Sequence, residues 1–197
     1  MASTANVAKS QEFAIDLGVR VVVDGRNGHF TKRFVKTFQS AYTFANLSVD
    51  GDPGPKTLAA MAECRNNGFK LSKNFTIQEI GITKGSKRVT RSNPVFLVER
   101  GLVESLQKLR NSIGRPIYIV SAFRDSDHNR VVGGAANSQH LYGRAVDIDR
   151  TKTPEITERQ AWAAGFNGVG LLSRSQPGRN VCHVDVRASR TRWFYTE

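Results

Sequence analysis

The first third of the chain alternates between glycine turns and runs whose apolar residues recur at helical spacing. Two turns share the pattern V-D-G-x-x-G-x-x-T, at 23–31 and 49–57, in which glycine can supply the positive φ of a tight turn. The apolar residues that follow at helical spacing are Phe34, Val35 and Phe38 in the first copy, and Leu58, Met61 and Ala62 in the second. This internal repeat predicts a small bundle of three short helices over about the first 66 residues.

The remainder of the chain has a different pattern, in which short apolar runs alternate with helical periodicity. A polar stretch with a glycine, 65–74, indicates a linker, and 92–114 is an amphipathic helix that ends at Gly114. Short strands are expected at 116–123, 145–149, 168–173 and 181–187, with a further helix at 157–166. We therefore predict an α+β protein, with a helical domain at 1–68 and an α+β domain with a central antiparallel sheet at 69–197.

Candidate chemistry is concentrated in the loop-rich run 121–149 and in the last predicted strand. Asp147 lies between apolar residues of a strand, where a buried carboxylate needs a partner. His140 lies seven positions before it, and His183 lies within a later strand. Each residue alone is commonly structural, but two imidazoles and one carboxylate make a frequent catalytic zinc set. Gly143, between the first two, leaves room for a close backbone approach.

Composition narrows the classes of partner. The chain has 197 residues and a formal net charge of +12, which favours polyanions such as nucleic acid, anionic lipid or an acidic cell wall. Lys and Arg are spread along the chain, the densest run being 83–91, and no nucleic-acid motif is found. No apolar run is long enough to span a membrane, and the N-terminal segment lacks the pattern of a signal peptide.

These motifs together resemble known families. The run 121–149, followed by "GFNGVGLLS" and "HVDVR", is similar to the M15-type zinc D-Ala-D-Ala carboxypeptidases and endopeptidases, over roughly 75–193. The V-D-G repeats resemble a three-helix peptidoglycan-binding domain, and the pair resembles bacteriophage endolysins. The resemblance implies a zinc cofactor held by His140, Asp147 and His183. It also implies that Arg124 faces the substrate and holds the oxyanion, and that Ser138 binds the substrate.

The identity of the general base is less direct. Several relatives carry an acid three residues before the last zinc histidine, but this chain has Asn180 there, whose amide cannot usefully accept a proton. In a strand, residues 183 and 185 project to the same face, so Asp185 is the candidate acid–base group. The alternative is that Asp185 orients a ligand, or pairs with Arg187 or Arg144.

The function expected from these observations is that of a zinc-dependent peptidoglycan peptidase, an endolysin that hydrolyses peptide stems or cross-links of the bacterial wall. Its partners would be peptidoglycan and anionic wall polymers, with no specific nucleic acid, and the protein would be a monomer. It would stay in the host cytoplasm until lysis. Two alternatives are a non-catalytic wall-binding protein on a degenerate peptidase fold, which the Asn180 departure supports, and a basic nucleic-acid binder. The sequence leaves the bond that is cut open, although cross-link cleavage suits a lysin best.

Overall fold

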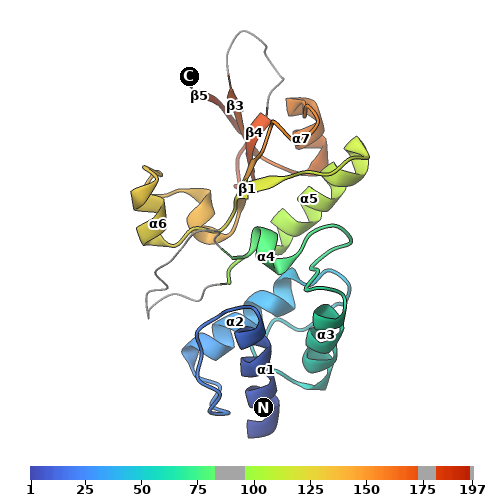
Figure 1. Cartoon of the computed structure of the whole chain (residues 1–197), viewed down its shortest axis with the longest axis vertical. Helices are drawn as coiled ribbons and strands as arrows, with labels where there is room; N and C mark the ends of the chain where they lie inside the picture. Colours follow the sequence, from blue (N-terminus) through green and yellow to red (C-terminus); the bar gives the residue numbers. More distant parts are fainter. Residues whose placement is uncertain (83–95, 173–180, 196–197) are drawn as a thin grey trace.

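The computed structural model of the chain describes residues 1–82, 96–172 and 181–195. Three helices form the N-terminal part, α1 (Thr4–Asp16), α2 (His29–Ala41) and α3 (Pro55–Asn66), and they pack together at one end of the molecule (Figure 1). The three-helix prediction is confirmed. Each of the two turns begins the helix that follows it, because a glycine in extended backbone, Gly28 or Gly54, occupies the N-cap of α2 or α3.

In each copy of the repeat, the side chain of a buried glutamine forms hydrogen bonds with the turn. Gln11 of α1 donates to Asp24 Oδ1 (2.8 Å) and accepts from the Gly25 backbone N–H (2.9 Å). Gln39 of α2 makes the same two contacts in the second copy, donating to the Asp50 carboxylate (2.9 Å) and accepting from the Gly51 N–H (2.8 Å). The repeat is thus a helix–turn–helix unit with a glutamine at its centre, and the buried amide satisfies turn groups that would otherwise be unpaired.

The segment expected to be a linker is packed against both halves of the protein. Leu71 is fully buried, and its carbonyl accepts from the Thr43 backbone N–H (3.0 Å). A short helix, α4 (Ile77–Ile80), follows with a capping box at its start. Beyond it, Phe96 packs on Phe34 of α2 with ring centroids 5.7 Å apart. One continuous hydrophobic core therefore runs from the helical part into the α+β part.

The longest helix of the α+β part begins later than its apolar pattern suggests. Helix α5 spans Arg100–Ile113 and ends, as expected, at Gly114 in the left-handed conformation (φ 67°). The residues before it are held by the backbone of other segments. Leu97 N–H donates to the Gly81 carbonyl (3.2 Å) and Glu99 N–H donates to the Gly143 carbonyl (2.9 Å). These tertiary hydrogen bonds take the place of a first helical turn.

A five-stranded sheet forms the centre of this part, in the order β1-β2-β4-β3-β5. Its strands are β1 (Ile119–Ser121), β2 (Ala145–Ile148), β3 (Gly168–Leu172), β4 (Val181–Asp185) and β5 (Thr191–Tyr195). The first three pairings along this order are antiparallel, as predicted, but β5 pairs with β3 in parallel. The sequence pattern missed β5, an edge strand whose residues are largely exposed and which therefore lacks a clean apolar alternation.

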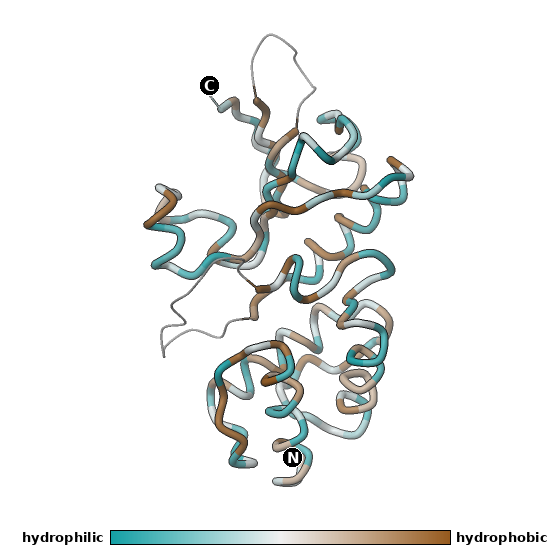
Figure 2. The backbone as a smooth tube through the Cα atoms, in the orientation of Figure 1, coloured by the Kyte–Doolittle hydropathy of each residue, from teal (hydrophilic) through white to brown (hydrophobic). Residues whose placement is uncertain are grey.

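Helices flank this sheet on both sides. Figure 1 shows α5 and α7 (Glu158–Ala164) on one side, and α6 (Ser126–Val131) on the other. Apolar side chains from the middle strands, Val146, Val169 and Val184, belong to the core shared with α5. Figure 2 shows apolar positions along the strands of the sheet. The neighbouring positions on β2 and β4, Asp147 and His183, alternate with those valines, and the period-2 geometry of a strand directs them to the opposite face.

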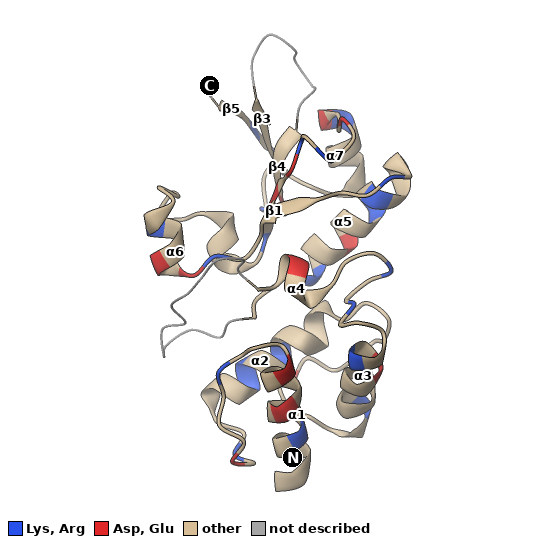
Figure 3. Cartoon of the chain, viewed as in Figure 1, with Lys and Arg blue, Asp and Glu red and all other residues tan. Residues whose placement is uncertain are grey.

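The surface carries its excess positive charge in both halves. Lys and Arg lie on the N-terminal helices as well as around the sheet, with Asp and Glu between them (Figure 3). The densest basic run of the sequence, 83–91, lies outside the described residues. Among the described residues, none of the helices combines the length and the apolar character needed to cross a membrane.

Candidate metal and catalytic site

The pairing of β2 with β4 places two of the candidate ligands opposite each other. Asp147 and His183 are Cα partners in the antiparallel register, and His183 Nδ1 lies 2.9 Å from Asp147 Oδ1. Both side chains project from the sheet face that α5 does not cover. A register slip of one residue would send one of them to the core face, so the hydrophobic pattern of the strands also fixes this pair.

The third candidate, His140, comes from a turn. It lies in a 3-10 helix, η1 (Gln139–Tyr142), which ends at Gly143 in the left-handed conformation (φ 65°). A Cβ on Gly143 would lie 2.5 Å from the Leu97 carbonyl oxygen, so only glycine fits this close approach. The close backbone approach expected at Gly143 is confirmed. His140 Nε2 then lies 3.2 Å from Asp147 Oδ1 and 3.3 Å from His183 Nδ1.

The three side chains have the donor set and the tautomers that a metal ion requires. One nitrogen of each ring faces an oxygen that can only accept: His140 Nδ1 donates to the Ala122 carbonyl (2.6 Å) and His183 Nε2 donates to Asp185 Oδ2 (3.0 Å). The other nitrogen of each ring faces the shared centre and offers a lone pair there when the ring is neutral. Ligand atoms of His140, Asp147 and His183 all lie within 4.8 Å of one another, and this group can hold a metal ion.

The close contacts among these side chains shift the pKa values of Asp147 and His183. Burial raises the pKa of Asp147, but hydrogen bonds with His140 and His183 outweigh it, and the pKa lies well below its usual range. Burial lowers the pKa of His183, while its contacts with Asp147 and Asp185 raise it, and the net direction is upward. The carboxylate thus stays ionised beside the two rings, as a metal ligand must.

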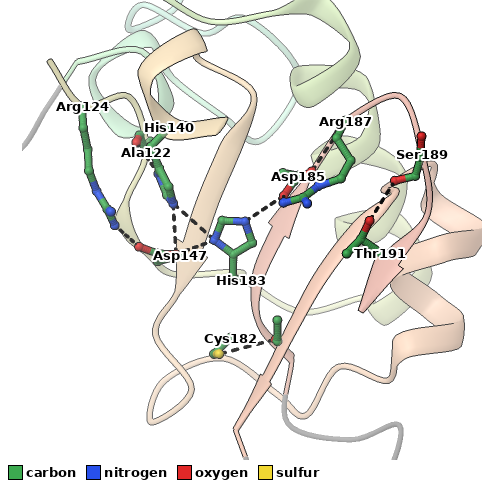
Figure 4. A network of polar contacts seen from close by, with 11 residues as sticks. Ala122, Arg124, His140, Asp147, Cys182, His183, Asp185, Arg187, Ser189 and Thr191 are labelled. Carbon is green, nitrogen blue, oxygen red and sulfur yellow. Dashed lines mark hydrogen bonds and ion pairs between the residues drawn. The ribbon is translucent and has the colours of Figure 1, made fainter. Parts of the chain in front are cut away.

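Asp185 lies on the far side of the His183 ring from Asp147 (Figure 4). It is fully buried, and both of its oxygens are engaged. Arg187 donates through Nε to Oδ1 (2.8 Å) and through Nη2 to Oδ2 (2.6 Å). Burial raises the pKa of Asp185, and the hydrogen bonds from Arg187 and His183 bring it down to about 2.

The geometry of Asp185 bears on the role expected for it. The imidazole of His183 stands between the Asp185 carboxylate and the Asp147 carboxylate. The expectation that Asp185 is the general base therefore stays a prediction. Its contacts are those of the alternative, a carboxylate that orients a histidine ligand while paired with Arg187. Asn180, the other position considered for the base, lies outside the described residues.

Two glycines of β3 make space for this arrangement. Gly168 is the Cα partner of Asp185, and Gly170 is the partner of His183. A Cβ on Gly168 would lie 2.2 Å from Asp185 Oδ2, and one on Gly170 would lie 3.0 Å from His183 Cβ. The pattern G-V-G-L-L, which by itself predicted only a strand, therefore keeps the site face of β3 free of side chains.

Arg124 lies, as expected, beside His140, Asp147 and His183, which together are called the metal group below. Its guanidinium pairs with the Asp147 carboxylate, and its Nε–H donates to Ser121 Oγ (2.8 Å). Its backbone N–H also donates to the His140 carbonyl (3.1 Å), which ties β1 to the turn that carries His140. Ser138 is the N-cap residue of η1, but its hydroxyl makes no capping hydrogen bond. Its proposed contact with substrate remains a prediction.

Sequence reasoning missed the contribution of β5. Trp193 packs against the His183 ring with centroids 5.1 Å apart, and the Arg187 guanidinium lies 4.8 Å from the centre of the indole. The W-x-Y spacing in the last strand was the available signal, since i and i+2 share a strand face. Without the sheet order, nothing in the sequence placed that face beside His183.

Comparison with known proteins agrees with this geometry. Residues 73–185 match the family model described as "Peptidase M15", and residues 4–61 match the one described as "Putative peptidoglycan binding domain". The chain is also similar to a protein of Streptomyces albus G named zinc D-Ala-D-Ala carboxypeptidase. The two are 31% identical over 185 residues, which cover 90% of this chain and 68% of the relative.

Proposed function

The chain belongs to the peptidase M15 family, and we propose that it is a zinc-dependent peptidase that hydrolyses the peptide stems or cross-links of peptidoglycan. The observation that carries this proposal is the convergence of His140, Asp147 and His183 within 4.8 Å, with tautomers that leave one lone pair of each ring for a metal. Two imidazoles and one carboxylate suit Zn²⁺ and leave a coordination position open.

Different residues of the chain would have different roles around that ion. Zinc, when bound, supplies Lewis-acid activation of the scissile carbonyl and of a water. Asp147 and His140 would hold it from β2 and η1, and Asp185 would keep His183 in the tautomer that ligates through Nδ1. Arg124, next to Asp147, has further N–H donors that can hold the carbonyl oxygen as negative charge develops on it.

The helical part supplies attachment to the wall in this proposal. It matches a peptidoglycan-binding model, and it carries a cavity of about 860 Å³ between α1, the loop after it and the start of α2. This volume lies within the range of small-molecule binding pockets. The net charge of +12 would add attraction to anionic wall polymers, and this attraction would weaken at high salt.

The finer part of the proposal is a lytic role. An enzyme with a wall-binding module that cleaves cross-links would dismantle the wall, as an endolysin does, whereas trimming of free stem ends would leave the network intact. We therefore favour endopeptidase over carboxypeptidase activity, with the protein held in the host cytoplasm until the membrane is opened.

The test is mass spectrometry of fragments that the zinc-loaded protein releases from defined peptidoglycan. Monomeric stems released from cross-linked dimers would support an endopeptidase, and loss of a terminal D-Ala alone would indicate a carboxypeptidase. Sedimentation with purified walls without any released fragment would instead identify a non-catalytic wall-binding protein.

A further inference from the structure

The edge strand β5 presents two aromatic side chains on the same sheet face as the metal group. Trp193 and Tyr195 are two residues apart and share one face, while Phe194 between them packs against the hydrophobic core. In the parallel register, Trp193 pairs with Gly170 of β3, and Gly170 in turn pairs with His183 of β4. His183, Gly170 and Trp193 therefore lie in one row across β4, β3 and β5.

The absence of a side chain at Gly170 lets both rings lean toward the metal group. A Cβ there would lie 2.7 Å from Tyr195 Cε2 and 3.1 Å from Trp193 Cε2, so the two rings occupy the space above the glycine. The same Cβ would lie 3.0 Å from His183 Cβ, which places the aromatic rings and the histidine on one face.

The indole is held in place, whereas the phenol is only partly covered. Trp193 packs against the His183 ring and beneath the Arg187 guanidinium, and Tyr195 meets it edge-on with ring centroids 6.2 Å apart. Tyr195 itself is 41% exposed. A rigid aromatic side chain with one apolar and one polar end suits a ligand-binding wall.

The hydroxyl of Tyr195 lies within the electrostatic reach of the metal group and is available as a donor. Burial raises the pKa of this phenol, and the charge of Asp147 raises it further, so the proton stays on at neutral pH. A phenol O–H can donate one hydrogen bond, and the exposed part of Tyr195 leaves it open to a bound ligand.

We propose that Tyr195 is a substrate-binding residue of this peptidase, whose hydroxyl donates a hydrogen bond to an oxygen of the bound peptide. With Trp193 it forms the wall of the site on the β5 side, opposite Arg124, and the two rings pack against small apolar side chains such as the methyl of alanine. This proposal rests on the proposed peptidase function and adds to it the surface that recognises the substrate.

The decisive variant is Tyr195→Phe, which removes the hydroxyl and keeps the ring. The matched control is Tyr118→Phe, because Tyr118 is similarly exposed (46%) and precedes β1 at the opposite edge of the sheet. We expect Tyr195→Phe to bind zinc as the parent does and to lose about 10-fold or more in kcat/KM on a synthetic acyl-D-Ala-D-Ala peptide, the scale of one lost hydrogen bond. The control should match the parent.

A second readout separates this proposal from the proposed function. The affinity of the zinc-loaded protein for the same peptide, measured by calorimetry, should fall in Tyr195→Phe even if the parent binds the peptide without cleaving it. Equal turnover and equal affinity in Tyr195→Phe and the parent would overturn the role of Tyr195 while leaving the peptidase assignment intact. Loss of zinc in Tyr195→Phe would also overturn it, since the residue would then act through the metal site. A parent protein that neither binds nor cleaves the peptide overturns both.

Discussion

Asp147 and His183 stand directly opposite each other on β2 and β4, with Asp147 Oδ1 2.9 Å from His183 Nδ1. Because the two strands are hydrogen-bonded neighbours in the sheet, the pair is held by the backbone and not by flexible loops. His140 joins it from a turn that its own contacts with Ala122 and Arg124 tie to β1. The strand pairing and these contacts therefore position the three candidate ligands, and several consequences can be measured.

Removing one ligand should abolish metal binding. We expect about one zinc per chain in the parent protein, and little in His140→Ala or Asp147→Ala, since two remaining ligands hold the ion weakly. Elemental analysis after gel filtration measures this directly. The control is His29→Ala, at the start of α2 and far from the group in sequence and fold. Full activity of metal-free protein would contradict the zinc assignment.

Asp185 should act on metal affinity. Substitution by Asn keeps the shape, but its amide can donate to His183 Nε2 and so favour the wrong tautomer, and we expect zinc affinity to fall by about 10–100-fold. Competition with a chelating dye provides the measurement, with Asp127→Asn on the surface of α6 as the control. If zinc affinity is unchanged and only the catalytic rate falls, Asp185 moves a proton after all.

Gly168 should tolerate no side chain. A Cβ there would lie 2.2 Å from Asp185 Oδ2, so Gly168→Ala forces the buried Asp185–Arg187 pair to move, at a cost of about 1–3 kcal/mol. The matched control is Gly101→Ala in α5, where the nearest atom to a new Cβ is 3.9 Å away and alanine favours the helix. Thermal unfolding should show a lower Tm for the first variant and an equal or higher Tm for the second.

Asp24 and Asp50, in the two turns of the repeat, should make the stability of the fold decrease in acid. Backbone hydrogen bonds from Arg26 and Asp52, and then the side chains of Gln11 and Gln39, lower the pKa of Asp24 and of Asp50 below the usual 3.8. A lowered folded-state pKa gives stability that is present above pH 3.8 and is lost as the pH falls through the folded-state value.

The variant Asp50→Asn isolates this effect, because its side chain does not titrate. Its Tm should lie below that of the parent at pH 6, and the difference should shrink as both are acidified toward pH 3. A difference that stays constant over that range would show that the charge of Asp50 contributes nothing.

The lytic proposal predicts a dependence on membrane integrity. Bacteria that express the protein in the cytoplasm should grow until the membrane is permeabilised, and then lyse, because the substrate lies outside the membrane. Culture turbidity after addition of a membrane-opening agent measures this, and Asp147→Ala should not lyse. Prompt lysis without permeabilisation would refute the requirement.

Local sequence patterns alone predict some features of this protein. The V-D-G repeats specify two turns and the helices that follow them, since glycine conformation and apolar period are local properties. The strands that carry Asp147 and His183 are also predictable, because a polar residue between apolar neighbours in a strand stands out. The three candidate ligands followed from that pattern and from a family resemblance.

The tertiary structure decided the rest, because it depends on which segments become neighbours. Asp185 shares a strand face with His183, as the sequence predicted, but only the rotamer of the imidazole and the position of Arg187 set it behind the ring. The segment predicted to be a linker is instead packed against the core, where Leu71 is fully buried. Strand β5 has too little burial of its own to show a pattern, and its aromatic residues reach the site only because β3 carries glycine where they cross it.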